Sequence, residues 1–318
     1  MEHAKYRQNL PQLRDTPLLT DGGIETTLIF HDGFELPLFA AFTLLDTENG
    51  RAALHRYYDS YIQVALKQHV GFILDTPTWR ASEVWGSALG YDGAALDRIN
   101  RAAVEMLFGL RTAFEGSEPF VVSGNIGPKG DGYVASELMV ARDAADYHEP
   151  QVHTFASAGA DMISAITMTH VGEAVGIARA CARHSVPLAL SFTLETDGCL
   201  PSGQPLGDAI REVDADPSSR PAYYMINCAH PDHFRGVLRP DADWTKRIRG
   251  LRANASRKSH AELDAADTLD RGHPLKLAHD YAGLLPLLPN LKVFGGCCGT
   301  DHRHIDEIAR TCIPEPVS

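Results

Sequence analysis

The feature that most constrains the fold is a unit that recurs along the whole chain. Each unit has a short apolar run, then a polar or glycine-containing turn, then a stretch with helical spacing. The runs number eight: Leu18–Thr20, Val70–Leu74, Phe120–Ser123, Met162–Ile166, Pro187–Phe192, Tyr223–Ile226, Gly250–Ala253 and Leu291–Phe294. Apolar residues three and four positions apart predict helices over 54–65, 99–107, 171–182 and 304–312. Alternating strands and helices imply a parallel sheet, and eight units predict a closed (β/α)8 TIM barrel.

An open, doubly wound sheet is the alternative architecture. It would more naturally have fewer strands and a nucleotide-binding loop, and the chain contains neither G-x-G-x-x-G nor a Walker loop. The length of 318 residues is typical of one barrel with insertions. We therefore expect a single α/β domain over residues 1–318. The runs Tyr223–Ile226 and Gly250–Ala253 give the weakest strand signals.

Composition limits the class of partner. The formal net charge is −12 and no basic stripe stands out, which argues against a nucleic-acid partner. The first residues are polar, and no stretch approaches the roughly 18 apolar residues of a membrane span. We expect a cytoplasmic protein without a signal peptide. Six cysteines in a long chain of this kind favour thiols and metal ligands over a disulfide framework.

Three cysteines form the most informative motif. Cys297 and Cys298 stand together in Gly295-Gly296-Cys297-Cys298-Gly299-Thr300, and Cys228 lies in Asn227-Cys228-Ala229-His230. Each cluster directly follows a predicted strand, the sixth or the eighth, and such strand ends carry the chemistry of a barrel. Three thiolate ligands leave the fourth tetrahedral position of zinc open, which is the catalytic arrangement.

Other assignments of the cysteines and histidines stay open at this point. One alternative is that the three cysteines bind no metal and are buried free thiols. A nearby histidine, from His230, His233, His302 or His304, would close the site into a four-ligand structural one, although a helix begun by Thr300-Asp301 would carry the last two away. Cys181, Cys199 and Cys312 are expected to be spectators.

The order of motifs resembles the homocysteine S-methyltransferase family over nearly the whole length. The segment 20–28, Thr-Asp-Gly-Gly-Ile-Glu-Thr-Thr-Leu, is similar to that family's first-strand D-G-x-x-x-T motif, and 123–128, Ser-Gly-Asn-Ile-Gly-Pro, to its G-S-I-G-P loop. Gly159-Ala160-Asp161, Ile226-Asn227-Cys228 and the closing Gly-Gly-Cys-Cys-Gly-Thr also match. The resemblance implies a TIM barrel with Zn²⁺ held by Cys228, Cys297 and Cys298.

The resemblance further implies methyl transfer from an onium donor, such as S-methylmethionine, to the thiol of homocysteine, which yields methionine. Both partners are then small molecules, and no side chain beyond the metal site needs to be catalytic. We expect substrate contacts from the strand-end residues Asp21, Gly22, Gly23, Glu25, Thr167, Phe192 and Asn227. Trp79, Trp85 and Trp244 are candidates to line an onium pocket through cation–π contact.

The chain departs from the family pattern at the fourth strand. Relatives usually have a Glu-Thr pair there, whose carboxylate holds the ammonium of homocysteine, but Ile166-Thr167 occupies the aligned position. Glu25 is an additional carboxylate after the first strand, and we hypothesise that it replaces the missing charge. The segment Arg252–Ser259 also differs from the usual P-N-S-G-E loop.

Two alternative functions remain at this stage: a zinc-binding barrel that stores or senses a thiol, and a redox protein that uses Cys297 and Cys298 as a vicinal dithiol. The sequence does not determine the donor, the exact acceptor or the oligomeric state.

Overall fold

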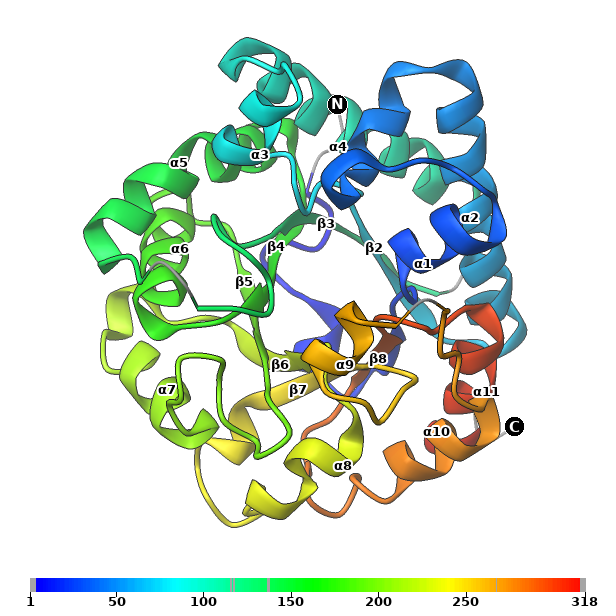
Figure 1. Ribbon diagram of the computed structural model, residues 1–318, viewed down its shortest axis with the longest axis vertical. Coiled ribbons are helices and arrows are strands. Elements are labelled where there is room, and N and C mark those ends of the chain that lie inside the picture. Colours follow the sequence, from blue (N-terminus) through cyan, green and yellow to red (C-terminus); the bar gives the residue numbers. More distant parts are fainter. Residues whose placement is uncertain (1–3, 115, 117, 136–137, 267, 315–318) are drawn as a thin grey trace.

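The computed structural model describes residues 4–114, 116, 118–135, 138–266 and 268–314, and a closed barrel of parallel strands occupies its centre (Figure 1). Each of the eight predicted runs overlaps a strand, and neighbouring strands along the chain pair in order until β8 pairs with β1. The strands are β1 Leu18–Leu19, β2 Gly71–Asp75, β3 Phe120–Ile126, β4 Met162–Met168, β5 Leu188–Thr193, β6 Tyr223–Asn227, β7 Ile248–Ala253 and β8 Val293–Gly296. The predicted (β/α)8 barrel is confirmed.

Helices surround the barrel, as Figure 1 shows. The α-helices are α1 Ile24–Thr26, α2 Glu48–Lys67, α3 Glu83–Ala88, α4 Gly93–Ala113, α5 Ala141–Ala158, α6 Val171–Arg183, α7 Leu206–Val213, α8 Pro231–Phe234, α9 His260–Asp264, α10 Pro274–Ala282 and α11 His302–Cys312. All four predicted helices are present. The Asp301 carboxylate accepts a hydrogen bond from the Arg303 backbone N–H, so the predicted N-cap begins α11. No helix in the described part of the chain has the length and apolar character needed to cross a membrane.

The hydrophobic core has two layers. The larger layer lies between the barrel and the helices, where the inner face of α2 packs Leu54, Tyr58 and Ile62. The smaller layer fills the barrel interior with residues from successive strands, including Leu18, Ile73, Val121, Met162, Ile166, Ala189, Tyr223, Met225 and Val293. Because side chains fill the interior, the barrel is a closed core, and the space for chemistry lies at its end.

Strand direction decides which end carries that space. In a parallel barrel all the strand-to-helix connections emerge at the C-terminal ends of the strands. The short helices α1 and α9, which follow β1 and β7, lie over this end of the barrel in Figure 1. The sequence segments singled out after β1, β2, β3, β4, β6 and β8 are therefore brought to one rim.

Candidate metal and substrate site

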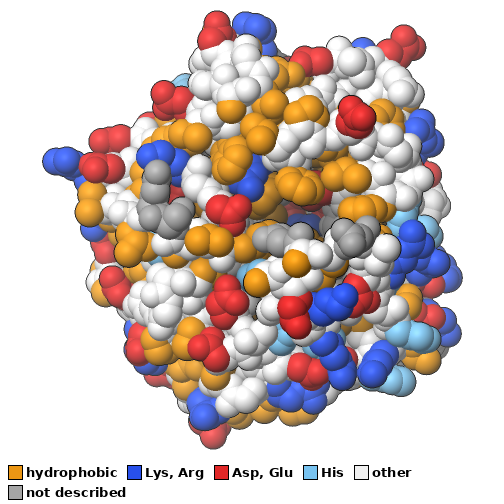
Figure 2. Space-filling view, in the orientation of Figure 1, with side chains coloured by type: hydrophobic (Ala, Val, Ile, Leu, Met, Phe, Trp, Pro, Cys, Tyr) orange, Lys and Arg blue, Asp and Glu red, His pale blue; other side chains and the backbone are white. Residues whose placement is uncertain are grey.

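A cavity of about 390 Å³ opens at the C-terminal end of the barrel. Figure 2 shows a hollow near the centre of this face, bordered largely by hydrophobic side chains with charged groups deeper inside. Its lining comes from the segments after seven strands, and includes Asp21, Glu25, Asp75, Arg80, Asn125, Tyr133, Ile166, Thr167, Cys228, Arg252, His260, Cys297 and Cys298. β5 contributes no lining residue among those described.

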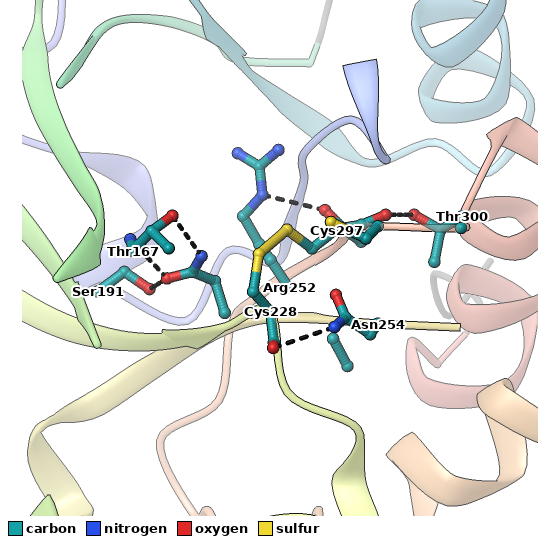
Figure 3. Close-up of a disulfide and its surroundings, with 12 residues drawn as sticks. Thr167, Ser191, Cys228, Arg252, Asn254, Cys297 and Thr300 are labelled. Atoms are coloured by element: carbon teal, nitrogen blue, oxygen red, sulfur yellow. Dashed lines mark hydrogen bonds between the residues drawn. A yellow bond between two sulfur atoms is a disulfide. The ribbon is translucent and has the colours of Figure 1, made fainter. Parts of the chain in front are cut away.

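The three predicted metal ligands meet in this cavity. The Sγ atoms of Cys228, Cys297 and Cys298 all lie within 4.8 Å of one another. Cys228 and Cys297 are joined by a disulfide (Figure 3), although the sequence had favoured thiols at these positions. Sulfur atoms close enough to share one metal ion are also close enough to be oxidised to a disulfide. The bond joins Cys297 to Cys228, directly after β6, and not to its neighbour Cys298, so the structure does not contain the vicinal disulfide expected of a Cys297–Cys298 redox pair.

The backbone at Cys228 is held in an uncommon conformation. Its φ is +53°, in the left-handed region that residues with a Cβ rarely adopt. Two side chains from the segment after β7 bind its carbonyl oxygen: Asn254 Nδ2 donates at 3.0 Å, and His260 Nε2 lies 2.6 Å away. These contacts fix the position of the Cys228 thiol, because a strained backbone persists only where its surroundings hold it.

Gly23 lets the first loop approach the cysteine segment. A Cβ built on this residue would lie 2.7 Å from the Cys297 carbonyl oxygen, which is too close for any side chain. The same carbonyl accepts a 2.7 Å hydrogen bond from Thr300 Oγ1 (Figure 3). The glycines after β1 and the threonine before α11 therefore act together to position Cys297.

Thr167, for which a substrate contact is predicted, lies at an irregularity in β4 and lines the cavity. Its φ is +65°. Asn227 Oδ1 accepts hydrogen bonds from the Thr167 backbone N–H at 2.9 Å and from Ser191 Oγ at 2.6 Å, and Asn227 Nδ2 donates to Thr167 Oγ1 at 3.1 Å. Asn227 is fully buried and is not among the cavity-lining residues, so it holds Thr167 in place without facing the cavity itself.

A charged triad lies at the bottom of the cavity. The Arg252 guanidinium donates to Asp21 Oδ1 at 2.5 Å and to Asp75 Oδ2 at 2.7 Å, and the three side chains are at most 5% exposed. Tyr57 OH donates to the other Asp21 oxygen at 2.7 Å. Burial raises the pKa of Asp21, while the Arg252 charge opposes this rise. The triad has two acids and one base, so its ionised form carries one negative charge at the cavity.

Ile166 and Glu25 line the same cavity. Ile166 is 9% exposed and belongs to the apolar core inside the barrel, so this position offers no charge to a ligand. Glu25, on α1, is partly buried. Burial, together with the negative charge of Asp21, raises the pKa of Glu25 to about 7, while Arg80 and Arg252 oppose this rise.

Tyr133 covers the sulfur cluster from the segment after β3. Its hydroxyl lies 3.2 Å from Cys298 Sγ and donates to Cys228 Sγ at 3.9 Å. Its ring packs on His260, with 4.4 Å between the ring centroids. A phenol at this distance donates a hydrogen bond to a thiolate and shields it from water.

Several predicted residues lie elsewhere. Phe192 is fully buried against Tyr224 and does not line the cavity, because its side chain is directed into the layer between barrel and helices. Trp244 packs against Gly207 outside the barrel. His230 and His304 are buried at the N-termini of α8 and α11, where each ring accepts from a backbone N–H. Within the described ranges, the only group of three or more close metal-binding side chains is the cysteine cluster.

Sequence reasoning did not identify Arg252, Arg80 or Tyr133 as site residues. In the sequence, Arg252 stands out only as part of a segment that differs from the family pattern, and its place near the C-terminal end of β7 is the signal that points to the site. Arg80 and Tyr133 follow the strands β2 and β3 by several residues, within connections whose course the sequence pattern does not reveal.

Comparisons with known proteins agree with this architecture. The homocysteine S-methyltransferase family model matches residues 18–312. Crystal structures of the homocysteine methyltransferase MmuM from Escherichia coli are similar in fold: the oxidized form has a TM-score of 0.73 at 20% identity and the metallated form 0.71 at 21%. Each of these alignments covers 93% of this chain and 96% of the other. A comparison with curated proteins gave no significant match. Because the family model spans nearly the whole barrel and both cysteine motifs, the chain belongs to the homocysteine S-methyltransferase family.

Proposed function

We propose that the protein is a zinc-dependent methyltransferase that moves a methyl group from an onium donor to the thiol of homocysteine. The observation that carries this proposal is the cluster of three cysteine sulfurs inside a substrate-sized cavity at the C-terminal end of the barrel. Family membership supports the reaction class, and a metallated form of the E. coli enzyme is known.

The three cysteines fit a zinc ion. In tetrahedral zinc sites with Zn–S bonds of about 2.3 Å, neighbouring sulfurs are about 3.8 Å apart. A separation of at most 4.8 Å among the three Sγ atoms therefore requires only small adjustments, once the disulfide is reduced. Cys228, Cys297 and Cys298 would hold the ion and leave one position facing the cavity, where the bound ion would keep a substrate thiol deprotonated at neutral pH.

The transfer itself needs few protein groups. The thiolate sulfur of the acceptor forms a bond to the methyl carbon, the bond from that carbon to the onium atom breaks, and its electron pair stays on the leaving atom. A sulfonium donor thus becomes a neutral thioether without proton transfer. The cavity contributes orientation and exclusion of water, which together lower the barrier for a reaction between two bound molecules.

Glu25 is the proposed partner of the acceptor ammonium. Ile166 cannot pair with a cation, and Glu25 lines the same cavity. Burial raises the pKa of Glu25 to about 7, with Asp21, Arg80 and Arg252 as the charged groups that act on it. An ammonium bound beside it would favour the ionised carboxylate, so binding of an amine-bearing thiol improves as the pH rises through this range.

Replacing Glu25 with glutamine is expected to raise the KM for homocysteine about tenfold or more, because a hydrogen-bonded charge pair is lost. The KM for 4-mercaptobutanoate, which is homocysteine without the amino group, should stay within about twofold of the wild-type value. Steady-state kinetics at pH 8 with both thiols would measure this difference. If both KM values rise alike, Glu25 has a structural role, and if the wild type prefers the amino-less thiol, the acceptor is not homocysteine.

The reaction class is tested by a matrix of substrates. We expect the reduced, zinc-loaded protein to methylate homocysteine with S-methylmethionine or another onium donor. The other donors to be tested are S-adenosylmethionine, betaine and dimethylsulfoniopropionate, and mass spectrometry would identify the products. X-ray absorption should show a fourth sulfur at the metal when homocysteine is added. Tight zinc binding without turnover of any pair would instead favour a barrel that stores or senses thiols.

A further inference from the structure

Arg80 is a buried cation whose side chain lines the substrate cavity. It follows β2 and is 5% exposed. Its guanidinium is sandwiched between two indole rings, with Cζ 3.8 Å from the Trp79 ring centroid and 3.6 Å from that of Trp85. Trp85 is itself anchored through a 3.2 Å hydrogen bond from Nε1 to the Pro128 carbonyl oxygen. The stacking holds the guanidinium plane rigidly at the wall of the cavity.

The hydrogen-bonding capacity of this cation is largely unused. Among the described residues, Arg80 forms no ion pair, and its single hydrogen bond runs from Nη1 to the Gly130 carbonyl oxygen at 3.0 Å. Arg80 Nε and the adjacent Trp79 Nε1 are buried donors without an acceptor. The nearby Asp131 already accepts from the backbone N–H groups of Tyr133 and Val134. Buried donors without partners are uncommon in native proteins, and at a ligand cavity they indicate where a ligand acceptor binds.

We propose that Arg80 binds the carboxylate of an amino-acid substrate, with Trp79 Nε1 as a second donor. The inference rests on the proposed methyl transfer and deepens it by assigning the side chains that recognise the substrate carboxylate. The negative charges of Asp21, Glu25 and Asp75 in the same cavity disfavour a doubly charged anion such as phosphate. A zwitterion matches the cavity, because its carboxylate meets Arg80, its ammonium meets Glu25, and its sulfur remains for the cysteine cluster.

Two substrates carry a carboxylate that Arg80 can bind: the acceptor homocysteine, and an amino-acid donor such as S-methylmethionine. The guanidinium recognises either in the same way, through charge-assisted hydrogen bonds. Kinetics with decarboxylated analogues separate these sources. The acceptor arm compares homocysteine with 3-aminopropane-1-thiol, and the donor arm compares S-methylmethionine with (3-aminopropyl)dimethylsulfonium. The KM increase caused by the Arg80→Gln substitution follows whichever substrate places its carboxylate at Arg80.

A direct binding experiment tests the site without turnover. Calorimetric titrations would use L-methionine, its deaminated analogue 4-(methylthio)butanoate and its decarboxylated analogue 3-(methylthio)propylamine. We expect Arg80→Gln to weaken binding of both carboxylates about 10- to 100-fold and to leave binding of the amine unchanged, which also shows that the variant is folded. Arg80→Lys keeps the charge and should restore part of the affinity.

Each remaining outcome overturns the inference. Equal weakening of the amine and the carboxylates would make Arg80 a structural support for the tryptophans, and unchanged affinities, or no binding of any carboxylate by the wild type, would remove the anion site. Failure of the proposed function has a different signature: carboxylate binding that depends on Arg80, without methylation of any thiol. Methylation with unaltered kinetics in Arg80→Gln would refute the anion site and leave the proposed function intact.

Discussion

Replacing Cys298 with alanine is expected to abolish stoichiometric zinc binding and to reduce methyl transfer at pH 7 by at least about 30-fold. The lower bound follows from the chemistry of the acceptor, because an ordinary thiol with a pKa near 8.5 is only about 3% thiolate at pH 7. Loss of the ion leaves the acceptor in this mostly protonated form. Elemental analysis of the reduced protein and initial-rate kinetics would measure the two effects.

The fold should survive this substitution, because two layers of apolar side chains stabilise the barrel without a metal ion. Cys199→Ala is the matched control, since Cys199 is a partly exposed cysteine outside the cavity and should leave zinc content and rate unchanged. Oxidation of the wild type should also prevent zinc loading, because it joins two of the three ligands. Full zinc occupancy in Cys298→Ala would refute the ligand assignment.

Arg252→Met is expected to lower the free energy of unfolding by about 3–5 kcal/mol at pH 8. Among the described residues, Arg252 is the only cation paired with the buried carboxylates of Asp21 and Asp75, and a buried charge left without its partner carries a cost of this size. Urea denaturation monitored by circular dichroism would measure the change. Arg249→Met on the same strand is the control: Arg249 is partly exposed, donates only to the Gln12 carbonyl oxygen among its described contacts, and should cost about 1 kcal/mol or less.

The cost of Arg252→Met should decrease as the pH falls. Burial already raises the pKa of Asp21 in the native protein, and Arg252 holds that rise in check. Without Arg252 the folded state keeps the proton more tightly than the unfolded state, so stability falls as the pH rises from the unfolded pKa near 4 through the higher folded pKa. The variant should therefore be less impaired at pH 5.5 than at pH 8. Equal losses at both values would mean that Arg252 acts through packing alone.

The barrel and the sulfur cluster could be predicted from sequence because their signals are local. Alternation of apolar runs with helical spacing specifies strands and helices, and a parallel barrel places every strand's C-terminal end on one rim. Cys228 and Cys297 follow β6 and β8 within one residue of the strand, so their convergence follows from topology alone. The glycines before Cys297 are needed where neighbouring segments make close contact: a Cβ built on Gly295 would lie 2.0 Å from Thr20 Oγ1.

The sequence pattern did not predict in the same way whether a side chain at a strand end faces the cavity or the outer layer. Phe192 and Thr167 are each the last residue but one of a strand, yet Phe192 packs outward while the irregularity in β4 brings Thr167 to the cavity. In a strand successive side chains point to opposite faces, so a shift of one residue decides between the cavity and the outer layer.

The sequence by itself determined the order of strands and helices, the rim on which the site lies and the three cysteines that cluster there, because each depends on residues within or directly beside a strand. Only the tertiary structure paired Arg252 with Asp21 and Asp75, stacked Arg80 between two tryptophans and placed Tyr133 over the sulfurs. These arrangements join residues from separate parts of the chain. The free energy of each interaction depends on how deeply the groups are buried and how far apart they lie, and a sequence pattern gives neither quantity.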